Sequence, residues 1–296
     1  MVPGAWMGTA VGLGTSVDAL AALAAHLRIE TEDIPADPRV RRLLADIAAE
    51  VLGGHDGDPG AAAAPVVGLA RTSLRQAAEL IENPGRRGGW DQVDVPLLQS
   101  IGRLSMAVAD AVRVAESSLD SLRTRLSTPG AAFLDVGTGT GWLAIAMARS
   151  HPGLRVVGID VFEPALSLAE ENVAGEGMAE RVELRLQDVT TLEARATYEA
   201  IWLPMPFLPA EIVPQAVAAA RLALCPGGWL LAGTFAGTDD KLSRLLTDLR
   251  IVRSGGHPWQ ADELTGVMDA AGLADTGEVT RTWPDPVRLF AGRRQP

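Results

Sequence analysis

Apolar positions in the first 127 residues recur at the three- and four-residue spacing that is typical of helices. Helices are expected after Thr15 and Ser16, from about Pro38 to Gly53, over about 66–82 and over about 96–127. Turn-forming residues dominate the stretches 53–65 and 83–96, which therefore read as loops. The pattern predicts an all-helical N-terminal domain over residues 1–127, acting as a pocket lid, a dimer contact or both.

From Ala131 onward, short apolar runs alternate with helical segments. The runs cover 131–136, 154–160, 181–188, 200–203 and 228–233, and two more near the C-terminus read as an antiparallel pair. Strand–helix alternation of this kind predicts an α/β domain with a mostly parallel sheet that helices cover on both faces. We expect this second domain over residues 128–296, with the junction at 128–130.

Composition narrows the classes of partner. The formal net charge is −11 and the sequence pI is near 4.9, so phosphate backbones and anionic membrane surfaces are repelled. The single cysteine excludes an intrachain disulfide, and the four scattered histidines give no metal-binding spacing. The mildly apolar N-terminus lacks the positive start of a signal peptide, and no uncharged apolar run approaches the ~20 residues of a membrane span. We therefore expect a cytoplasmic location, no bound metal, and neither nucleic acid nor membrane as a partner.

The stretch 133–148 carries the most informative motif. An apolar run ends near Asp135, and a loop with Gly137, Gly139 and Gly141 leads into a helix. Glycines in such a loop permit tight turns and let a ligand approach the backbone. A dinucleotide fingerprint requires a third glycine where this chain has Trp142, and the Gly-Lys-Ser/Thr of a P-loop is absent. Both phosphate-binding interpretations are therefore disfavoured.

Three acids stand at or near the ends of the first three predicted strands. They are Asp135, Asp160 and Asp188. An acid at the tip of the second strand can accept both ribose hydroxyls of a nucleoside, and one after the third can accept from an adenine amine. Each acid has a purely local alternative, as a cap or the start of a turn. Together they predict a ligand site at the carboxyl edge of the sheet.

This arrangement resembles the class I S-adenosylmethionine-dependent methyltransferases over about residues 130–293. The resemblance implies that family's Rossmann-like, seven-stranded sheet with one antiparallel strand near the edge. It also implies S-adenosylmethionine as cofactor and S-adenosylhomocysteine as product. The glycine loop would hold the methionine end, Asp160 the ribose and Asp188 the adenine, with Val161 and Phe162 flanking the ring. The implied cofactor-binding residues are Asp135, Gly137, Thr138, Gly139, Gly141, Asp160, Val161, Phe162, Gln187, Asp188, Val189, Leu203 and Pro204.

The fourth predicted strand runs into three prolines, at 204, 206 and 209. A sheet strand cannot continue through such a run, because proline donates no backbone hydrogen bond. In the family the resemblance names, enzymes that methylate amide or adenine nitrogens often carry Asn-Pro-Pro-Tyr here, and Pro204 stands at the Asn position. This difference argues against those acceptors. Leu203, Met205 and Phe207 are expected to line a substrate pocket, with a plain stiff turn as the alternative.

Other candidate residues lie outside the motif. Trp90 precedes the predicted helix 96–127, on which Gln99, Arg103 and Met106 share one face, either toward a substrate or toward solvent. His257 is the candidate catalytic base, with a surface-loop histidine as the alternative. Tyr198 lies at the far end of its strand and is not a candidate.

These residues favour a bacterial methyltransferase that acts on a small molecule, with secondary metabolism as the suggested setting and a homodimer as the suggested assembly. Positioning would supply much of the rate. Two alternatives remain open at this stage. One is a lyase or cyclase that releases methylthioadenosine without a second substrate, and the other is a non-enzymatic protein that binds the cofactor.

Overall fold

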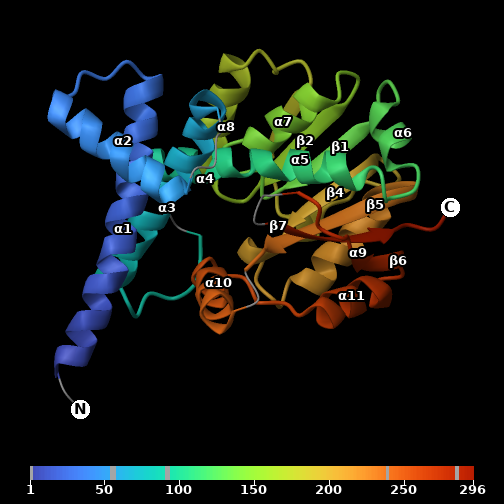
Figure 1. Cartoon of the computed structure of the whole chain (residues 1–296). Helices are drawn as coiled ribbons and strands as arrows, with labels where there is room; N and C mark the ends of the chain where they lie inside the picture. Colours follow the sequence, from blue (N-terminus) through green and yellow to red (C-terminus); the bar gives the residue numbers. More distant parts are fainter. Residues whose placement is uncertain (1–2, 54–57, 91–93, 238–239, 284–286) are drawn as a thin grey trace. The chain divides into compact units, whose positions relative to one another are not determined.

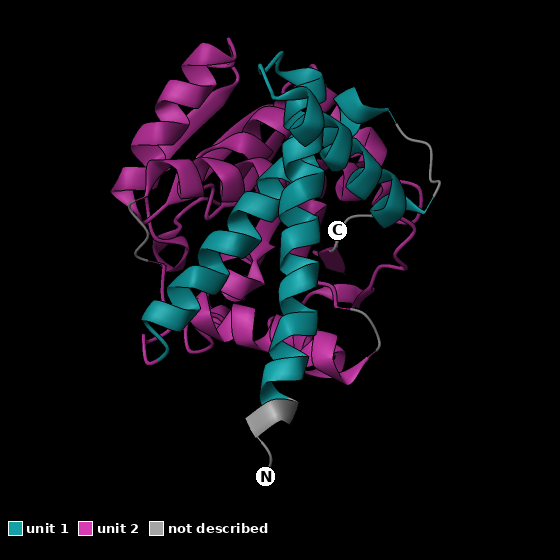
Figure 2. Ribbon diagram, turned by 60° about the vertical axis from the view of Figure 1, so that its left-hand side comes forward, with its two compact units in different colours: residues 1–84 teal, residues 85–296 magenta. Residues whose placement is uncertain are grey.

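The computed structural model describes residues 3–53, 58–90, 94–237, 240–283 and 287–296 (Figure 1). The chain divides into two compact units, residues 1–84 and residues 85–296 (Figure 2). This division differs from the expected junction at 128–130, because residues 85–127 contact the α/β part. Val112, Leu122 and Leu126 are fully buried in the same hydrophobic core as Phe133.

The described residues of unit 1 form the helices α1 (Pro3–Thr31), α2 (Pro38–Leu52) and α3 (Pro59–Glu82). The side chains of Asp37 and Asp58 accept backbone N–H bonds at the starts of α2 and α3, and Gly53 ends α2 in the left-handed conformation. Two expected starts were wrong. Helix α1 begins well before Thr15, and α3 begins at Pro59 rather than near residue 66. Of the expected loop 53–65, residues 54–57 lie outside the described residues.

Helix α1 has an unusually apolar composition. Its stretch Trp6–Thr31 is long and apolar enough to cross a membrane, judged by length and composition alone, and 6% of its apolar window is buried. The charged residues Asp18 and Arg28 interrupt this stretch. It lies near the N-terminus, and a core helix of a soluble protein or a signal sequence can have the same length and composition as a membrane-spanning helix.

The helix expected over 96–127 is in fact three helices, α4 (Val95–Leu104), α5 (Met106–Ala115) and α6 (Leu122–Ser127). Ser105 lies at the first break, where its hydroxyl donates to the carbonyl of Gly102. Serine competes with the helix for backbone hydrogen bonds in this way. Ser121, with a φ of 59°, precedes α6 in the left-handed region, so no continuous helix passes through it.

The sheet of unit 2 has seven strands in the order β3-β2-β1-β4-β5-β7-β6. The strands are β1 (Ala132–Val136), β2 (Arg155–Asp160), β3 (Val182–Leu186), β4 (Tyr198–Pro204), β5 (Leu224–Phe235), β6 (Ala274–Glu278) and β7 (Val287–Arg293). Strands β1 to β5 pair parallel, whereas β7 pairs antiparallel with both β5 and β6. This topology confirms the predicted fold class.

Helices cover both faces of this sheet, as Figure 1 shows. They include α7 (Trp142–Ser150), α8 (Glu163–Gly175), α9 (Val213–Ala223) and α11 (Ala261–Ala270), whereas α10 (Lys241–Arg253) contacts the segment that follows β4. Phe133 packs with α5 and α7 in one core, whereas its neighbour Leu134 packs with α9 and α11 in the other. Each fully buried side chain of this size stabilises the fold by about 1.5–3 kcal/mol.

The parallel strands place their carboxyl ends at one edge. Strand β1 ends at Val136, β2 at Asp160, β3 at Leu186 and β4 at Pro204. The register aligns β1 with both of its neighbours, since Leu134 pairs with Val157 on one side and Ile201 on the other. Ligands of open α/β sheets bind outside this edge, where β1 separates the two directions of winding.

Candidate functional site

The glycine loop follows β1 and has a backbone that only glycine adopts easily. Gly137, Gly139 and Gly141 have φ values of 62°, 55° and 80°. A Cβ on Gly137 would lie 3.0 Å from Cγ of Pro204 at the end of β4. The loop after β1 and the tip of β4 therefore lie in contact, as the sequence predicted for a shared site.

Three successive residues of this loop are each held by a different side chain. The Thr138 hydroxyl donates to Asp135 Oδ2 at 2.7 Å, and the Gly139 N–H donates to Asp160 Oδ2 at 2.7 Å. The side-chain amide of Asn172, on α8, donates to the Thr140 carbonyl at 2.9 Å. Side chains from β1, β2 and α8 thus fix the loop before any ligand binds.

Of the two acids of the loop, Asp135 is buried and Asp160 is partly buried. Burial raises the pKa of Asp135 to about 7, against the lowering effect of the Thr138 hydroxyl, and the charge of Asp160 raises it further. Burial also raises the pKa of Asp160, although the backbone N–H groups of Phe162 and Gly139 donate to it. Within the described part of the chain, neither carboxylate forms an ion pair with an arginine, lysine or histidine. Two such acids without a counter-ion make this edge favourable for a cationic ligand.

The tip of β3 lies beside the tip of β2. The Gln187 N–H donates to the Asp160 carbonyl at 2.9 Å, which holds the two tips together. Asp188 is exposed and precedes the short 3-10 helix η1 (Val189–Thr191), where its Oδ1 accepts from both the N–H and the hydroxyl of Thr190 at 2.8 Å. The role of Asp188 toward adenine remains a prediction.

The residues expected to flank the adenine lie nearby in the chain. Val161 is 68% exposed just beyond the tip of β2, and Phe162 is half-buried with its N–H bonded to Asp160 Oδ1 at 2.9 Å. Val189 is buried in the core that also contains Leu134. Of these three apolar side chains, the exposed Val161 is therefore the one that a ligand can contact most easily.

Strand β4 ends at Pro204 and turns into the 3-10 helix η2 (Met205–Phe207). Leu203 and Met205 are fully buried in the core, so of the expected pocket residues Phe207 is the accessible one. The Phe207 ring meets Trp90 edge to face at 5.0 Å and Phe235, at the end of β5, at 6.1 Å. The structure thus brings together Trp90 and Phe207, which are far apart in the sequence.

Comparisons with known proteins agree with this geometry. A family model described as a methyltransferase domain matches residues 133–228. The release factor glutamine methyltransferase of Cereibacter sphaeroides is 31% identical over 158 residues, covering 52% of this chain and 56% of that protein. Residues 133–228 therefore match a methyltransferase domain, and the sheet has the fold of the class I S-adenosylmethionine-dependent methyltransferases. The chain spans about half the length of the curated relatives it matches.

Solved methyltransferase structures share the fold over the whole chain. An O-methyltransferase family protein from Burkholderia thailandensis superposes with a TM-score of 0.64 at 17% identity, covering 100% of this chain and 99% of that one. Human N-acetylserotonin methyltransferase, in complex with S-adenosylmethionine, has a TM-score of 0.66 at 14% identity, with 100% and 99% covered. At these identities the likeness shows the fold alone.

The residues at this edge of the sheet fit S-adenosylmethionine. That molecule carries two positive charges, on its sulfonium and its amino group, and among the described residues neither Asp135 nor Asp160 has a cationic partner. The Asp160 carboxylate accepts from the N–H groups of Gly139 and Phe162, one at each oxygen, and its two oxygens offer about four lone-pair sites in all. The remaining lone pairs can accept hydroxyl groups such as those of the ribose.

Helix α4 of the methyltransferase contacts the helix that follows the glycine loop. Gln99 Oε1 accepts from the Trp142 indole N–H at 2.8 Å, and the Arg103 guanidinium lies 4.9 Å from the centre of the Trp142 ring. Met106 belongs to the next helix and packs against the core. Gln99 and Arg103 therefore both contact Trp142. Asn172, on α8, also holds the loop, and no feature of the sequence predicted this role.

His257 lies in a loop that packs against η2. A Cβ on its neighbour Gly256 would lie 2.4 Å from the Pro206 carbonyl oxygen. The His257 side chain is 45% exposed, with Nε2 3.8 Å from Glu263 Oε2 and the ring 4.8 Å from that of Trp259. Its role as a base remains a prediction.

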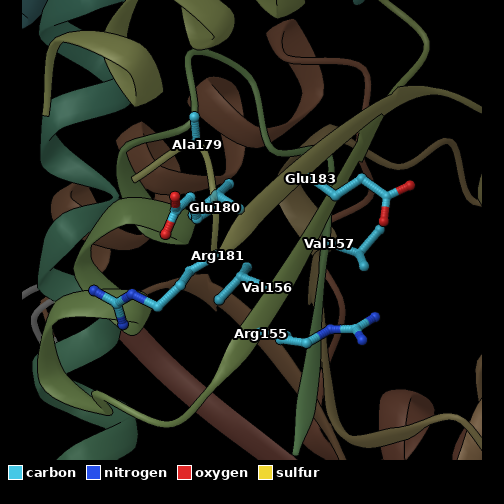
Figure 3. Close-up of a pocket in the computed structure, with 8 residues that line it drawn as sticks. Arg155, Val156, Val157, Ala179, Glu180, Arg181 and Glu183 are labelled. Atoms are coloured by element: carbon cyan, nitrogen blue, oxygen red, sulfur yellow. The ribbon is translucent and has the colours of Figure 1, made fainter. Parts of the chain in front are cut away.

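A separate pocket of about 220 Å³ lies at the opposite edge of the methyltransferase sheet, where β2 and β3 begin (Figure 3). Its lining includes Arg155, Arg181 and Glu183. Arg181 donates there to the carbonyls of Ala148 and Pro152. Because β2 runs from Arg155 to Asp160, the length of a strand separates this pocket from the acids of the candidate site.

Proposed function

We propose that this chain transfers the methyl group of S-adenosylmethionine to a small-molecule acceptor. The observation that carries the proposal is a pre-formed glycine loop next to the tip of β4. The loop is lined by the buried Asp135 and the partly buried Asp160, neither of which forms an ion pair with a described residue. The bound cofactor would supply an electrophilic methyl group on a sulfonium and leave as S-adenosylhomocysteine.

The aromatic residues beyond β4 support the acceptor side of the proposal. Phe207, Trp90 and Phe235 form a half-buried edge-to-face cluster next to Pro204, and the Arg250 guanidinium lies 5.8 Å from the centre of the Phe235 ring. Such a group suits a small acceptor with an apolar, planar part. The net charge of −11 opposes binding of nucleic acid.

A protein acceptor is the main competitor, because a relative with 31% identity is named a release factor glutamine methyltransferase. In the family that the sequence resembles, amide-methylating enzymes often carry Asn-Pro-Pro-Tyr at this point. This chain has Pro204 at the position of the asparagine, and a proline ring offers no hydrogen bond to an amide. The proposal therefore assigns a small molecule, with secondary metabolism in the cytoplasm as the suggested setting.

Positioning supplies much of the rate in this proposal. The glycine loop, which would hold the cofactor's methionine end, is fixed by the side chains of Asp135, Asp160 and Asn172. The position of the acceptor would be determined by η2 and Trp90. A nucleophile that approaches in line with the methyl–sulfur bond then needs little further help. His257 is the proposed base for an acceptor that must lose a proton.

Dimerisation through unit 1 is a further part of the proposal. Helix α2 carries four exposed apolar side chains, since Val40, Leu43, Ile47 and Val51 are 38–61% accessible. Exposed apolar faces of this kind favour association. Size-exclusion chromatography with light scattering, on the chain and on a Leu43→Glu variant, tests this part.

The proposal is tested with S-adenosylmethionine that carries an isotopic label on its methyl group. Purified chain and cell extract are incubated, and label is counted after ultrafiltration in the small-molecule and macromolecular fractions. We expect label in the small-molecule fraction, and its loss with Asp160→Asn. Label only in protein or tRNA would contradict the small-molecule assignment.

A further inference from the structure

Helix α4 approaches the glycine loop more closely than any side chain would allow. A Cβ on Gly102 would lie 1.9 Å from Thr140 Oγ1 and 3.1 Å from Trp142 Cδ1. Gly102 does not have a positive φ, so glycine is needed here for the contact and not for the backbone conformation. Both elements belong to unit 2, and α4 and α7 contact each other directly.

A chain of hydrogen bonds joins α4, α8 and the loop. The groups at its two ends determine which atoms of the chain donate and which accept. The indole of Trp142 can only donate, so Gln99 must turn its oxygen toward it, at 2.8 Å. The Thr140 carbonyl can only accept, so Asn172 must turn its nitrogen toward it, at 2.9 Å. Between them Gln99 Nε2 donates to Asn172 Oδ1, and Asn172 Nδ2 to Gln99 Oε1, both at 3.1 Å.

This network holds the part of the loop that the two acids do not reach. Asp135 and Asp160 hold Thr138 and Gly139, whereas the amide pair holds Thr140 and Trp142. Thr140 is 2% exposed, and its hydroxyl has no hydrogen-bond partner among the described residues. Packing against Gly102, and not a hydrogen bond, therefore determines where this side chain lies.

We infer that Gln99, Gly102 and Asn172 are positioning residues for the cofactor loop, so that α4 must be docked on Thr140 and Trp142 for S-adenosylmethionine to bind tightly. The inference rests on the proposed function for its ligand. It assigns Gln99 to the loop, in place of the substrate contact expected from the sequence.

The steric half of the inference is tested by a compensating pair of substitutions. Gly102→Ala places a methyl group against Thr140 Oγ1, and we expect the Kd for S-adenosylmethionine, from calorimetry, to rise at least tenfold. Thr140→Ala removes the hydroxyl that the new methyl group would meet, so Gly102→Ala combined with Thr140→Ala should recover most of the loss seen in Gly102→Ala alone. The matched control is Gly266→Ala in α11, where no atom lies within 4 Å of the new methyl, and it should bind like the wild type. A Gly102→Ala variant that binds normally, or a double variant no better than the single one, would overturn the inference.

The hydrogen-bonded half is tested without the cofactor. Asn172→Asp keeps the size of the side chain but removes both donations, and it places an oxygen against the Thr140 carbonyl. Hydrogen exchange followed by mass spectrometry on the free protein should show faster exchange in peptides covering 137–145, with β1 and β2 still protected. Unchanged exchange in the loop, or a loss of protection throughout unit 2, would contradict a local positioning role. Because this readout needs no ligand, it stays decisive even if the chain does not bind S-adenosylmethionine.

Kinetics separate positioning from chemistry. With an acceptor in hand, Asn172→Asp should raise the KM for S-adenosylmethionine while kcat changes by less than about threefold. A fall in kcat at unchanged KM would assign Asn172 to the chemical step and overturn the inference.

Discussion

The carboxylate of Asp160 and the backbone N–H of Gly139 are joined by a hydrogen bond of 2.7 Å, which connects the tip of β2 to the glycine loop after β1. The other oxygen of the same carboxylate accepts from Phe162 N at 2.9 Å. One partly buried side chain therefore shapes the loop and also presents its remaining lone pairs at the sheet edge. Loss of its charge should affect both the loop and the ligand.

Asp160→Asn should raise the Kd for S-adenosylmethionine at least tenfold. The amide offers one acceptor where the carboxylate offers two, so either Gly139 or Phe162 loses its partner, at a cost of about 1–3 kcal/mol. Calorimetric titration measures the loss. Asp262→Asn, an equal change of charge in the first turn of α11, is the control and should bind normally.

The affinity for S-adenosylmethionine should rise with pH. Burial raises the pKa of Asp135 to about 7 in the free protein, and a bound cation favours the ionised form, so binding releases a proton. If the pKa in the complex falls below 6, linkage of one proton gives an affinity about tenfold higher at pH 8 than at pH 6. Calorimetry in buffers of different ionisation enthalpy detects the proton. A flat profile in the wild type, or an equally steep one in Asp135→Asn, would count against this assignment.

The stability of the free protein should change in the opposite sense. Between the unfolded pKa of 3.8 and the folded pKa of about 7, the folded state holds a proton on Asp135 that the unfolded state releases. This group's contribution to stability is therefore full below pH 3.8 and is lost as pH rises toward 7. Thermal unfolding at pH 5.5 and 8 should show a smaller decline for Asp135→Asn than for the wild type.

Gly137→Ala should weaken both the fold and the cofactor site. Alanine at a φ of 62° costs about 1–2 kcal/mol, and its Cβ would lie 3.0 Å from Pro204 Cγ. Denaturant titration and calorimetry measure the two effects. Gly175→Ala at the end of α8, where a Cβ meets no atom within 4 Å, should be neutral or slightly stabilising. Equal behaviour of the two variants would show that the loop tolerates a side chain.

Phe207→Ala should raise the KM for the acceptor and leave the Kd for S-adenosylmethionine within about twofold. The substitution removes two edge-to-face contacts, with Trp90 and Phe235, each worth about 0.5–1.5 kcal/mol beyond buried area. Steady-state kinetics with the identified acceptor distinguish the two constants. Phe207→Tyr, which keeps the ring, should stay close to the wild type. A weaker Kd with an unchanged acceptor KM would move Phe207 to the cofactor side.

For an acceptor that must lose a proton, His257→Ala should lower kcat at neutral pH by about a hundredfold or more. The ring is 45% exposed and lies against Trp259, with Glu263 its nearest charged partner, so its loss removes few contacts. The pH profile of kcat provides the check. A fall of less than about threefold, with an ionisation near the histidine range retained, would contradict the assignment of His257 as the base.

Much of unit 2 was predictable because its signals are local. The strands β1 and β2 are buried on both faces and therefore appear in the sequence as apolar runs. The positive φ values of the loop require glycine, and Gly137, Gly139 and Gly141 can be recognised in the sequence. The position of Asp160 could be predicted for the same reason, because a residue at the end of a parallel strand lies at the carboxyl edge of the sheet.

The failures were of two kinds. Helix α1 is apolar on all sides, so no alternation of apolar and polar positions marks where it begins. Ser105 interrupts a helical pattern of apolar residues that continues on both sides of it. The partners of Gln99 could not be predicted either, because periodicity shows a helix face but not which element that face meets. Asn172 illustrates the same limit, since an asparagine within α8 carries no sign that it bonds to a distant loop.

The most direct test of the central claim is to follow S-adenosylmethionine by mass spectrometry in the presence of the pure chain, alone and with a small-molecule fraction of cell extract. We predict that the cofactor alone stays intact apart from spontaneous breakdown, and that S-adenosylhomocysteine accumulates when the fraction is added. Catalytic release of methylthioadenosine from the cofactor alone would contradict methyl transfer and identify a lyase or cyclase.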